Sequence, residues 1–248
     1  MDEEQYRIMY DVEDVHWWYR GMWEITAALL DHVSIDGQEL KILDAGCGTA
    51  GTTKALQRYG SVVGIDFSPL ALKLGRTRDP RIHLCRGTIS ELPFADSSFD
   101  VVTCFDVLYH LGVEDDLAAL REFYRVLKTG GLALIRVPAL EFLRARHDQQ
   151  VHTRHRYTLG EVDRMVRRAG FQPLRATYAN MLLLPPAAVM RVWQRVAGVH
   201  EGSDFDTGEG TMNGILKKVL SFEAALVRGG IDLPLGISAV CLARKQLG

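Results

Sequence analysis

The sequence has no long apolar run, no paired cysteine motif and no excess of charge of one sign. Its most apolar segment, residues 181–190, is too short to span a bilayer and contains two prolines. Residues 1–4 are acidic and lead into no apolar stretch, which argues against a secretory signal and predicts a cytoplasmic protein without a transmembrane anchor. The four cysteines include no CxxC pair, so we expect buried, reduced thiols and no metal site.

The charges nearly cancel. Twenty-nine Lys and Arg side chains stand against 31 Asp and Glu, for a net charge of −2. Such a chain has no overall basic field to gather nucleic acid, and we expect no stable nucleic-acid complex. With 248 residues, 47% of them hydrophobic, the chain can bury one large core, so we expect a single domain over residues 1–248, as a monomer or a homodimer.

Apolar runs without polar alternation predict buried parallel strands. These runs are residues 41–43, 61–65, 81–85, 99–104 and 132–137, with further strands expected at 171–178 and 237–243. Helical patterns lie between and after them, at residues 52–59, 69–76, 114–127, 158–169, 181–198 and 213–228. The alternation of strands and helices predicts an α/β fold with a mainly parallel sheet.

Three local signals predict where helices begin or end. Ser68 precedes Pro69, which is the usual order of an N-cap and a first helical residue. Thr158, with Glu161 three residues on, forms a capping box. The glycines at 130 and 131 are expected to stop the helix at 114–127.

The most informative segment is residues 41–51, KILDAGCGTAG, where a predicted strand enters a glycine-rich turn before a helix. Glycines in such a turn let the backbone approach a ligand closely. Asp66 ends the next strand, twenty residues after Gly46, and a carboxylate there can accept hydrogen bonds from both hydroxyls of a ribose. Taken alone, this pattern fits a nucleoside and a dinucleotide equally well.

Further features distinguish the two ligands. Asp44 stands two residues before the first glycine, where a carboxylate would repel a pyrophosphate but suits an ammonium and a sulfonium. Residues 91–106 (ELPFADSSFDVVTCFD) and 125–132 (RVLKTGGL) follow in order. With these motifs, residues 42–138 resemble the class I S-adenosylmethionine-dependent methyltransferases, in particular the broad small-molecule (type 11) group. The resemblance implies a Rossmann-like, doubly wound, seven-stranded sheet whose last strand is antiparallel, with S-adenosylmethionine as cofactor and S-adenosylhomocysteine as product.

The resemblance also implies roles for residues that match the family's motifs. By position, Asp44, Gly46 and Gly48 would line the methionine part of the cofactor, and Asp66 would hold the ribose. Phe67 and Ser68 would flank the adenine, and Thr88 and Ile89 would approach its amino edge. Phe105 would lie under the sulfonium. At Thr88 the family usually has an Asp. A hydroxyl accepts more weakly than a carboxylate, which predicts weaker recognition of the adenine amino group.

The N-terminal residues 16–20, HWWYR, resemble a cluster found in a subset of bacterial members, and residues 155–158, HRYT, match the same subset. The resemblance implies a helical lid over residues 1–38, with Tyr19 and Arg20 near the cofactor carboxylate. Aromatic packing of an N-terminal helix is the alternative interpretation.

The acceptor side is expected after the fourth strand and between the fifth and sixth. There His110 is the first candidate for a general base, with Tyr109 and Tyr157 next, although simple packing of these side chains stays open. Residues 144–175 hold eight arginines and three acidic residues. This excess predicts that Arg154 and Arg156 bind a phosphate or carboxylate of a small-molecule acceptor, such as a natural product, a sugar or a lipid-linked intermediate. A solvated helix face is the alternative.

The remaining hypotheses concern organisation and rival functions. Residues 39–140 would form the cofactor-binding core, 141–180 and 236–248 the substrate-side half of the sheet, and 181–235 a helical cap that closes over the acceptor or builds a dimer contact. For the apolar face of that cap, which includes Val189 and Trp193, core packing is favoured over contact with lipid. Asp204, Asp206 and Glu209 lack the spacing of a calcium loop. The rival functions are a tRNA or other nucleic-acid methyltransferase, an NAD-dependent oxidoreductase and a cofactor-binding partner subunit.

Overall fold

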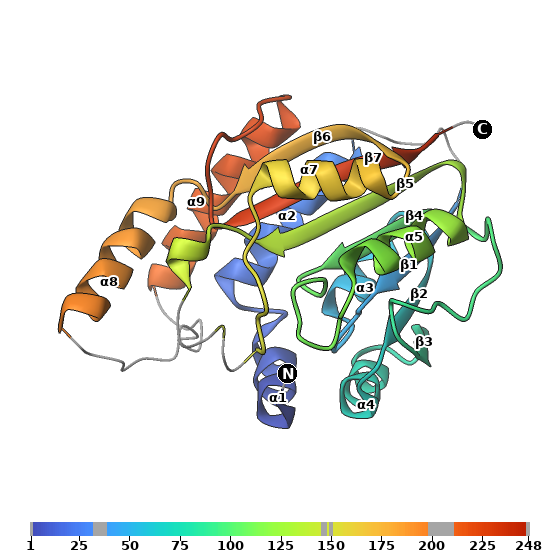
Figure 1. Cartoon of the computed structure of the whole chain (residues 1–248). Coiled ribbons are helices and arrows are strands. Elements are labelled where there is room, and N and C mark those ends of the chain that lie inside the picture. The colour runs from blue at the N-terminus through green and yellow to red at the C-terminus, as the bar shows by residue number, and fades with distance from the viewer. Residues whose placement is uncertain (1, 32–38, 145–147, 149–150, 198–210, 247–248) are drawn as a thin grey trace.

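A computed structural model of the chain describes residues 2–31, 39–144, 148, 151–197 and 211–246 (Figure 1). Within these residues, a seven-stranded sheet has the order β3-β2-β1-β4-β5-β7-β6. Its strands are β1 (Leu40–Ala45), β2 (Gly60–Asp66), β3 (His83–Arg86), β4 (Phe99–Phe105), β5 (Leu127–Pro138), β6 (Phe171–Ala179) and β7 (Ser238–Lys245). Neighbouring strands are parallel except for β7, which is antiparallel to both β5 and β6. The expected α/β fold, with its antiparallel last strand, is confirmed.

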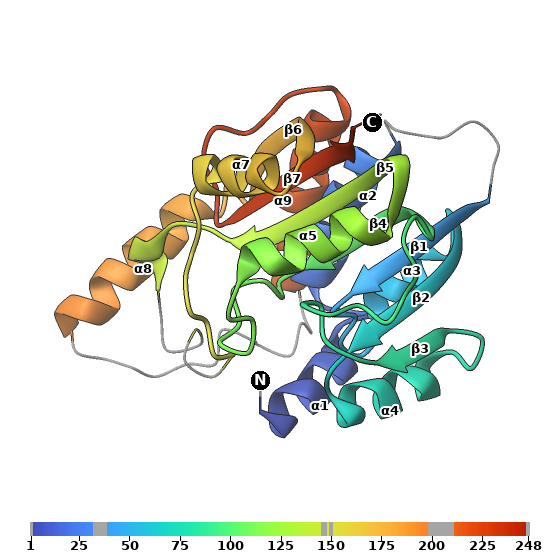
Figure 2. The same ribbon diagram turned by 45° about the vertical axis from the view of Figure 1, so that its right-hand side comes forward.

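Helices cover both faces of the sheet (Figures 1 and 2). They are α1 (Glu3–Val12), α2 (Trp17–Asp31), α3 (Gly51–Leu56), α4 (Pro69–Arg78), α5 (Asp116–Val126), η1 (Glu141–Leu143), α7 (Leu159–Arg168), α8 (Leu184–Ala197) and α9 (Thr211–Arg228). One face carries α5 and α7, and on the other α2 packs against α9. The apolar runs of the central strands β1, β4, β5 and β7 form the core between these layers, whereas the edge strand β3 has no fully buried residue.

The capping signals act as the sequence predicts. The Ser68 hydroxyl accepts from the backbone N–H of Ala71, and Pro69 is the first residue of α4. Thr158 and Glu161 form the complete capping box of α7. These local predictions are confirmed because the groups that a helix start leaves unpaired are satisfied by side chains within one turn.

The predicted glycine stop at residues 130 and 131 is wrong. Helix α5 already ends at Val126, and Leu127 leaves it in an extended conformation and pairs with Phe99. The two glycines therefore lie inside β5, next to a shift in its register with β4. Gly130 has φ +78°, which a residue with a side chain rarely adopts, so the glycine serves the start of the strand.

The region predicted as a helical cap divides into two different helices. Helix α9 packs on α2, and a Cβ atom at Gly21 would lie 2.4 Å from the Leu220 side chain. Glu223, fully buried on α9, accepts hydrogen bonds from the backbone N–H groups of Asn180 and Leu182. Helix α9 is thus part of the main body of the protein, whereas α8 extends away from it (Figure 1).

Core packing of α8 is a wrong prediction. Val189 is 69% exposed and Trp193 is 58% exposed. The helix contacts η1, but none of its described side chains, residues 184–194, is buried. The apolar residues of α8 therefore do not pack in the hydrophobic core.

Candidate active site

The sheet has one topological switch point, between β1 and β4. From β1 the chain moves outward to β2 and β3, and it then returns to place β4 on the other side of β1. The loops that follow β1 and β4 diverge there, which in α/β sheets leaves a crevice at the carboxyl ends of the strands. Asp44 near the end of β1 is aligned with Thr103 of β4. The residues singled out in the glycine-rich segment thus lie at the usual ligand position of this architecture.

The glycine-rich turn needs its glycines for steric reasons. Gly46 has φ +84°, and a Cβ atom there would lie 2.2 Å from the side chain of Val107. Gly48 has φ +52°, and its N–H donates to a carboxylate oxygen of Asp66 over 2.9 Å. The turn is therefore packed against the loop after β4 and tied to the end of β2. A side chain at Gly46 would overlap Val107, and one at Gly48 would press on Met9, so both positions require glycine.

Asp66 is buried at the end of β2. Besides the bond from Gly48, it accepts from the N–H of Ser68 over 2.9 Å. Burial raises the pKa of Asp66, while these backbone bonds oppose the shift. An ionised carboxylate can accept about four hydrogen bonds, so Asp66 has acceptor capacity left for a ribose hydroxyl. The residue fits the role that the sequence predicts.

Asp44 is 2% exposed and has a hydroxyl donor on each side. One oxygen accepts from Thr53 Oγ1 over 2.7 Å, and the other accepts from Thr103 Oγ1 over 2.9 Å. Burial raises the pKa of Asp44, and the two hydroxyls oppose the shift. A carboxylate so placed carries a charge that a bound cation would stabilise.

Helix α1 covers the glycine-rich turn. A Cβ atom at Gly48 would lie 2.9 Å from the Met9 methyl group, and one at Gly51 would lie 2.2 Å from the Glu13 carboxyl carbon. Glu13 accepts from Thr49 Oγ1 over 2.6 Å and forms a 3.1 Å ion pair with Arg78 of α4. These bonds fasten α1 to the turn. Neither Met9 nor Glu13 was singled out from the sequence.

Tyr6 of α1 reaches the other end of the same site. It is 6% exposed, and burial together with the nearby Asp66 carboxylate raises its pKa. A cavity of about 220 Å³ remains beside the turn, lined in part by Tyr19, Arg20 and Arg136. Glu13 also lines this cavity, so α1 forms part of its wall.

A buried ion pair closes the crevice on the β4 and β5 side. Arg136 of β5 donates from Nε to Asp106 over 2.8 Å, and its Nη2 lies 2.6 Å from the same carboxylate oxygen. The guanidinium lies against the rings of Trp18 and Phe105, 5.3 and 4.9 Å from their centroids. This contact attaches α2 to the sheet. A charged residue inside the apolar run 132–137 was the signal that could have identified Arg136.

The residues expected near the adenine are spread over three kinds of environment. Phe67 is 61% exposed, and Ser68 is buried as the N-cap of α4. Ile89 is buried, and the exposed Thr88 hydroxyl accepts from the N–H of Ser90 over 3.2 Å. The exposed ring of Phe67 and the aliphatic side chain of Ile89 are chemically suited to enclose a flat base. The adenine-binding roles of these four residues remain predictions.

The three candidate bases differ in whether they can accept a proton near pH 7. His110 Nδ1 lies 2.6 Å from the carbonyl oxygen of Val151. A carbonyl only accepts, so Nδ1 carries the proton and Nε2 is left with a lone pair. Burial lowers the pKa of His110 to about 4, which keeps the ring neutral near pH 7. Burial raises the pKa values of Tyr109 and Tyr157, so both phenols stay protonated.

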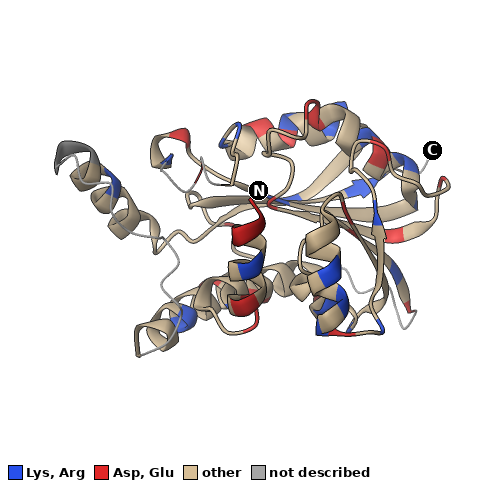
Figure 3. Cartoon of the chain, turned by 90° about the horizontal axis from the view of Figure 1, so that it is seen from below, with Lys and Arg blue, Asp and Glu red and all other residues tan. Residues whose placement is uncertain are grey.

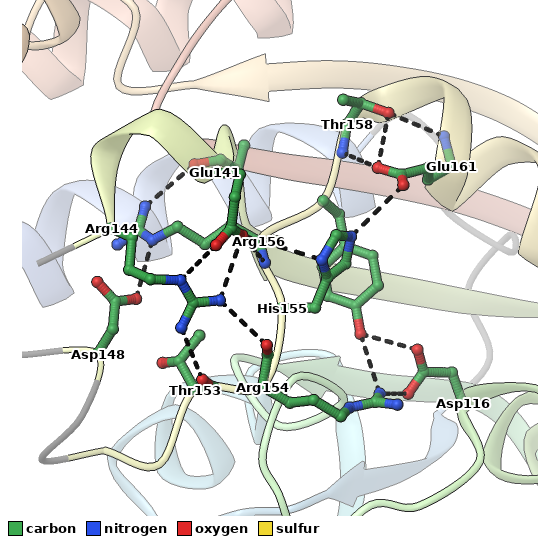
Figure 4. Close-up of polar contacts among 12 residues, drawn as sticks. Asp116, Glu141, Arg144, Asp148, Thr153, Arg154, His155, Arg156, Thr158 and Glu161 are labelled. Carbon is green, nitrogen blue, oxygen red and sulfur yellow. Dashed lines mark hydrogen bonds and ion pairs between the residues drawn. The ribbon is translucent and has the colours of Figure 1, made fainter.

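The predicted anion-binding arginines already have carboxylate partners (Figure 4). Arg154 is ion-paired with Asp116, which also accepts from the Tyr157 hydroxyl over 2.8 Å. Arg156 donates to Asp148 over 2.8 Å and to the carbonyl oxygen of Ala139 over 3.0 Å. An anionic acceptor would have to displace these carboxylates.

Two other expectations concern absent features. Within the residues that the structure describes, no three His, Cys, Asp or Glu side chains cluster as metal ligands would. Asp204, Asp206 and Glu209 lie outside those residues. No helix in the described ranges combines the length and apolarity that crossing a bilayer requires. The four cysteines are free thiols, of which Cys85 is only partly buried.

Residues 43–135 match the family model described as a methyltransferase domain. The demethylmenaquinone methyltransferase of Staphylococcus haemolyticus is 44% identical over 99 residues, which are 37% of this chain and 41% of that protein. The chain spans about half the length, or less, of the curated relatives it matches.

Two solved structures share the fold. One is from the complex between the Haloferax volcanii Trm112 methyltransferase activator and a methyltransferase, with a TM-score of 0.63, 21% identity and coverage of 100% of this chain and 97% of that one. The other is Haemonchus contortus phosphoethanolamine N-methyltransferase 2 in complex with S-adenosyl-L-methionine, with a TM-score of 0.58, 20% identity and coverage of 89% and 52%.

The sheet order, the antiparallel β7 and the glycine-rich turn at the switch point define the class I methyltransferase fold. The matched segment carries the turn, Asp66 and the loop after β4 in one continuous block. Residues 43–135 are therefore similar to the methyltransferase family, and the described residues have the class I methyltransferase fold.

Proposed function

We propose that the protein transfers the methyl group of S-adenosylmethionine to a small-molecule acceptor and releases S-adenosylhomocysteine. The observation that carries the proposal is the Asp66 carboxylate bonded to the glycine-rich turn at the switch point, with lone pairs left for a ribose. The positive φ angles of Gly46 and Gly48 turn the backbone at the end of β1, which supports the proposal because such a turn lets a ligand approach the main chain closely. The sulfonium of the bound cofactor supplies a methyl group that is already activated.

The residues on the β1 and β2 side would hold the cofactor. Asp44 offers a buried negative charge to the ammonium and the sulfonium, and Asp66 accepts from the ribose. Phe67, Ser68, Thr88 and Ile89 would enclose the adenine, with Thr88 as the weak acceptor of its amino group. Their roles follow from the match to the family's motifs.

The residues of α1 and α2 would enclose the bound cofactor. Tyr19 and Arg20 line the cavity and would lie near the cofactor carboxylate. Phe105 is the last residue of β4 and would lie beneath the sulfonium. Helix α1 would then act as the lid, because its Glu13 and Met9 contacts must open before the cofactor enters. Closing the lid again excludes water from the reaction.

The acceptor would be a neutral, aromatic molecule rather than an anionic one. The acceptor side holds the rings of Trp18, Tyr19 and Tyr109 and the uncharged His110. Its cationic side chains, Arg136, Arg154 and Arg156, are already paired with carboxylates. One relative is a demethylmenaquinone methyltransferase. His110 Nε2 would take a proton from the acceptor where one is present, with Tyr109 as a positioning donor. The Tyr157 hydroxyl donates to Asp116, so its part would be to hold Asp116 and Arg154 in place.

Binding and transfer experiments test this proposal. Titration with S-adenosylhomocysteine and, separately, with NAD distinguishes the methyltransferase from an oxidoreductase. Labelled S-adenosylmethionine is then incubated with a cell extract that is fractionated into small molecules, lipids, protein and nucleic acid. Asp66→Ala is the inactive variant, and Asp163→Ala, on the exposed face of α7, is the matched control.

We expect S-adenosylhomocysteine to bind and label to enter the small-molecule or lipid fraction, with both lost in Asp66→Ala alone. Label in nucleic acid would contradict the acceptor class, and binding of NAD instead would contradict the reaction. Binding without transfer, restored by a second protein, would indicate the partner-subunit function. Replacing Arg154 and Arg156 by Gln tests the anionic alternative: a raised KM with an unchanged free energy of unfolding and an unchanged kcat would support an anionic acceptor.

A further inference from the structure

Arg78, the last residue of α4, joins three parts of the chain. Its side chain is only 4% exposed although it carries a charge. Its Nε donates to the carbonyl oxygen of Thr49, in the glycine-rich turn, over 3.0 Å. Its Nη2 donates to the carbonyl oxygen of Tyr10 and to the Glu13 carboxylate, each over 3.1 Å, and its Nη1 donates to the Asp14 carboxylate. These contacts form the Arg78 latch, in which one guanidinium holds the turn after β1 and the C-terminal end of α1 together.

The Arg78 latch depends on the shape of the guanidinium as well as on its charge. A guanidinium is planar and offers five N–H donors in fixed directions, whereas a lysine ammonium is a point charge with three donors. The guanidinium carbon of Arg78 also lies 4.7 Å from the centroid of the Tyr10 ring, a cation–π contact. A lysine at this position would therefore keep the charge and lose most of the contacts.

The two helices that meet at the latch have complementary charges. Helix α4 contains three basic residues and no acidic one, and α1 is followed directly by Glu13 and Asp14. Figure 3 shows α1 and α4 beside each other, with acidic residues toward the C-terminal end of α1 and basic residues on α4. Arg76 of α4 is exposed and donates instead to the carbonyl oxygen of Leu84 in β3, over 3.4 Å. Within the described residues, Arg78 is thus the cation of α4 that is ion-paired with α1.

We propose that Arg78 is a positioning residue of the cofactor site, which holds α1 over the glycine-rich turn and thereby sets how fast a ligand enters and leaves. The side chains of Met9 and Glu13 lie on the turn, so a ligand that approaches its backbone from this side meets α1 first. All partners in the Arg78 latch belong to the chain itself, so the latch forms with or without a ligand. The control of ligand exchange rests on the proposed function, whereas the attachment of α1 does not.

Two measurements on the full chain test this proposal: amide hydrogen exchange of α1, and stopped-flow binding and release of S-adenosylhomocysteine. The test variant is Arg78→Lys, which keeps a positive charge beside the buried Glu13. Asp14→Asn is a milder variant that changes only the exposed end of the latch, because the Asp14 side chain is 58% exposed. Arg76→Lys is the matched control, the same substitution on the same helix but away from α1.

In Arg78→Lys we expect the amides of α1 to exchange at least about tenfold faster, because opening α1 then breaks fewer charge-assisted hydrogen bonds. The amides of β4 and β5 should exchange as in the wild type. The association and dissociation rate constants of S-adenosylhomocysteine should both rise about fivefold or more, with a change of less than about threefold in Kd, because α1 opens before both entry and release. Asp14→Asn should shift the same quantities less, and Arg76→Lys should match the wild type.

Unchanged exchange of α1 in Arg78→Lys would overturn the proposal. Faster exchange of α1, β4 and β5 alike would also overturn it, because Arg78 would then only support the fold. Faster exchange of α1 with unchanged rate constants for S-adenosylhomocysteine would overturn the control of ligand exchange. If α1 exchanges faster in the variant but the wild type binds no S-adenosylhomocysteine, the attachment of α1 by Arg78 stands and the proposed function fails.

Discussion

Replacing Asp44 by Asn should change stability and cofactor affinity in opposite directions. In the wild type, moving this carboxylate out of water costs several kcal/mol. The hydrogen bonds from the Thr53 and Thr103 hydroxyls to this carboxylate offset that cost by about 1.5–3 kcal/mol each. An Asn amide can accept from one hydroxyl and donate to the other, and its burial costs only about 1–3 kcal/mol. We therefore expect the free energy of unfolding at pH 7.5 to be unchanged or up to about 2 kcal/mol higher in Asp44→Asn.

The pH dependence of this difference has a definite sign. Burial raises the pKa of folded Asp44, so over the acidic range the folded protein holds a proton that the unfolded chain has lost. The contribution of Asp44 to stability is therefore complete below its unfolded pKa and falls as pH rises through its folded pKa. Asn does not titrate, so the stability advantage of the variant should grow with pH and then level off.

Cofactor affinity should fall in the same variant. The lost charge removes a charge-assisted hydrogen bond to the ammonium, worth about 1.5–3 kcal/mol, so the Kd for S-adenosylhomocysteine should rise roughly tenfold to a hundredfold. Urea unfolding at several pH values and calorimetric titration measure the two quantities, with Asp163→Asn as the control. A variant that loses more than about 2 kcal/mol of stability at pH 7.5, or that binds the cofactor as well as the wild type, would refute the reasoning.

Three other changes test separate parts of the structure. Gly21→Ala should destabilise the protein by about 1–3 kcal/mol, measured by urea unfolding, because the added methyl group overlaps the Leu220 side chain between α2 and α9. Glu223→Leu should lower the free energy of unfolding by about 3 kcal/mol, since the buried N–H of Asn180 and the partly buried N–H of Leu182 lose their acceptor; an exposed Glu→Leu change elsewhere serves as control. If His110 is the general base, the kcat of the wild type should stay constant from pH 8 down to near the His110 pKa of about 4. His110→Asn should then lower kcat about 100-fold or more with little change in the Kd for S-adenosylhomocysteine. An equal loss of S-adenosylhomocysteine binding would indicate that His110 only packs.

The sequence predicted the strands and the cofactor side of the site well. The strand runs were recognisable because a parallel strand covered on both faces has to be apolar throughout. The glycine-rich turn and Asp66 were recognisable because close backbone approach requires glycine in a fixed order after a strand. The capping box at Thr158 was a local signal complete within four residues.

The acceptor side was less predictable because charge depends on partners far away in the chain. Arg154 pairs with Asp116 and Arg136 pairs with Asp106, across 38 and 30 residues. Counting the arginines of one segment does not include carboxylate partners that lie far away in the chain. The same applies to Glu13, whose partner Thr49 stands 36 residues later and joins α1 to the glycine-rich turn.

The sequence by itself determined the class of fold, the place of the glycine-rich turn and the carboxylate that faces it, because these depend on patterns within one strand–turn–helix unit. Only the tertiary structure decided that α1 covers the turn, that α9 belongs to the body while α8 extends from it, and which arginines are neutralised. Apolar periodicity reports that a helix has an apolar face, but whether that face meets the core or the solvent depends on the other elements that pack beside it.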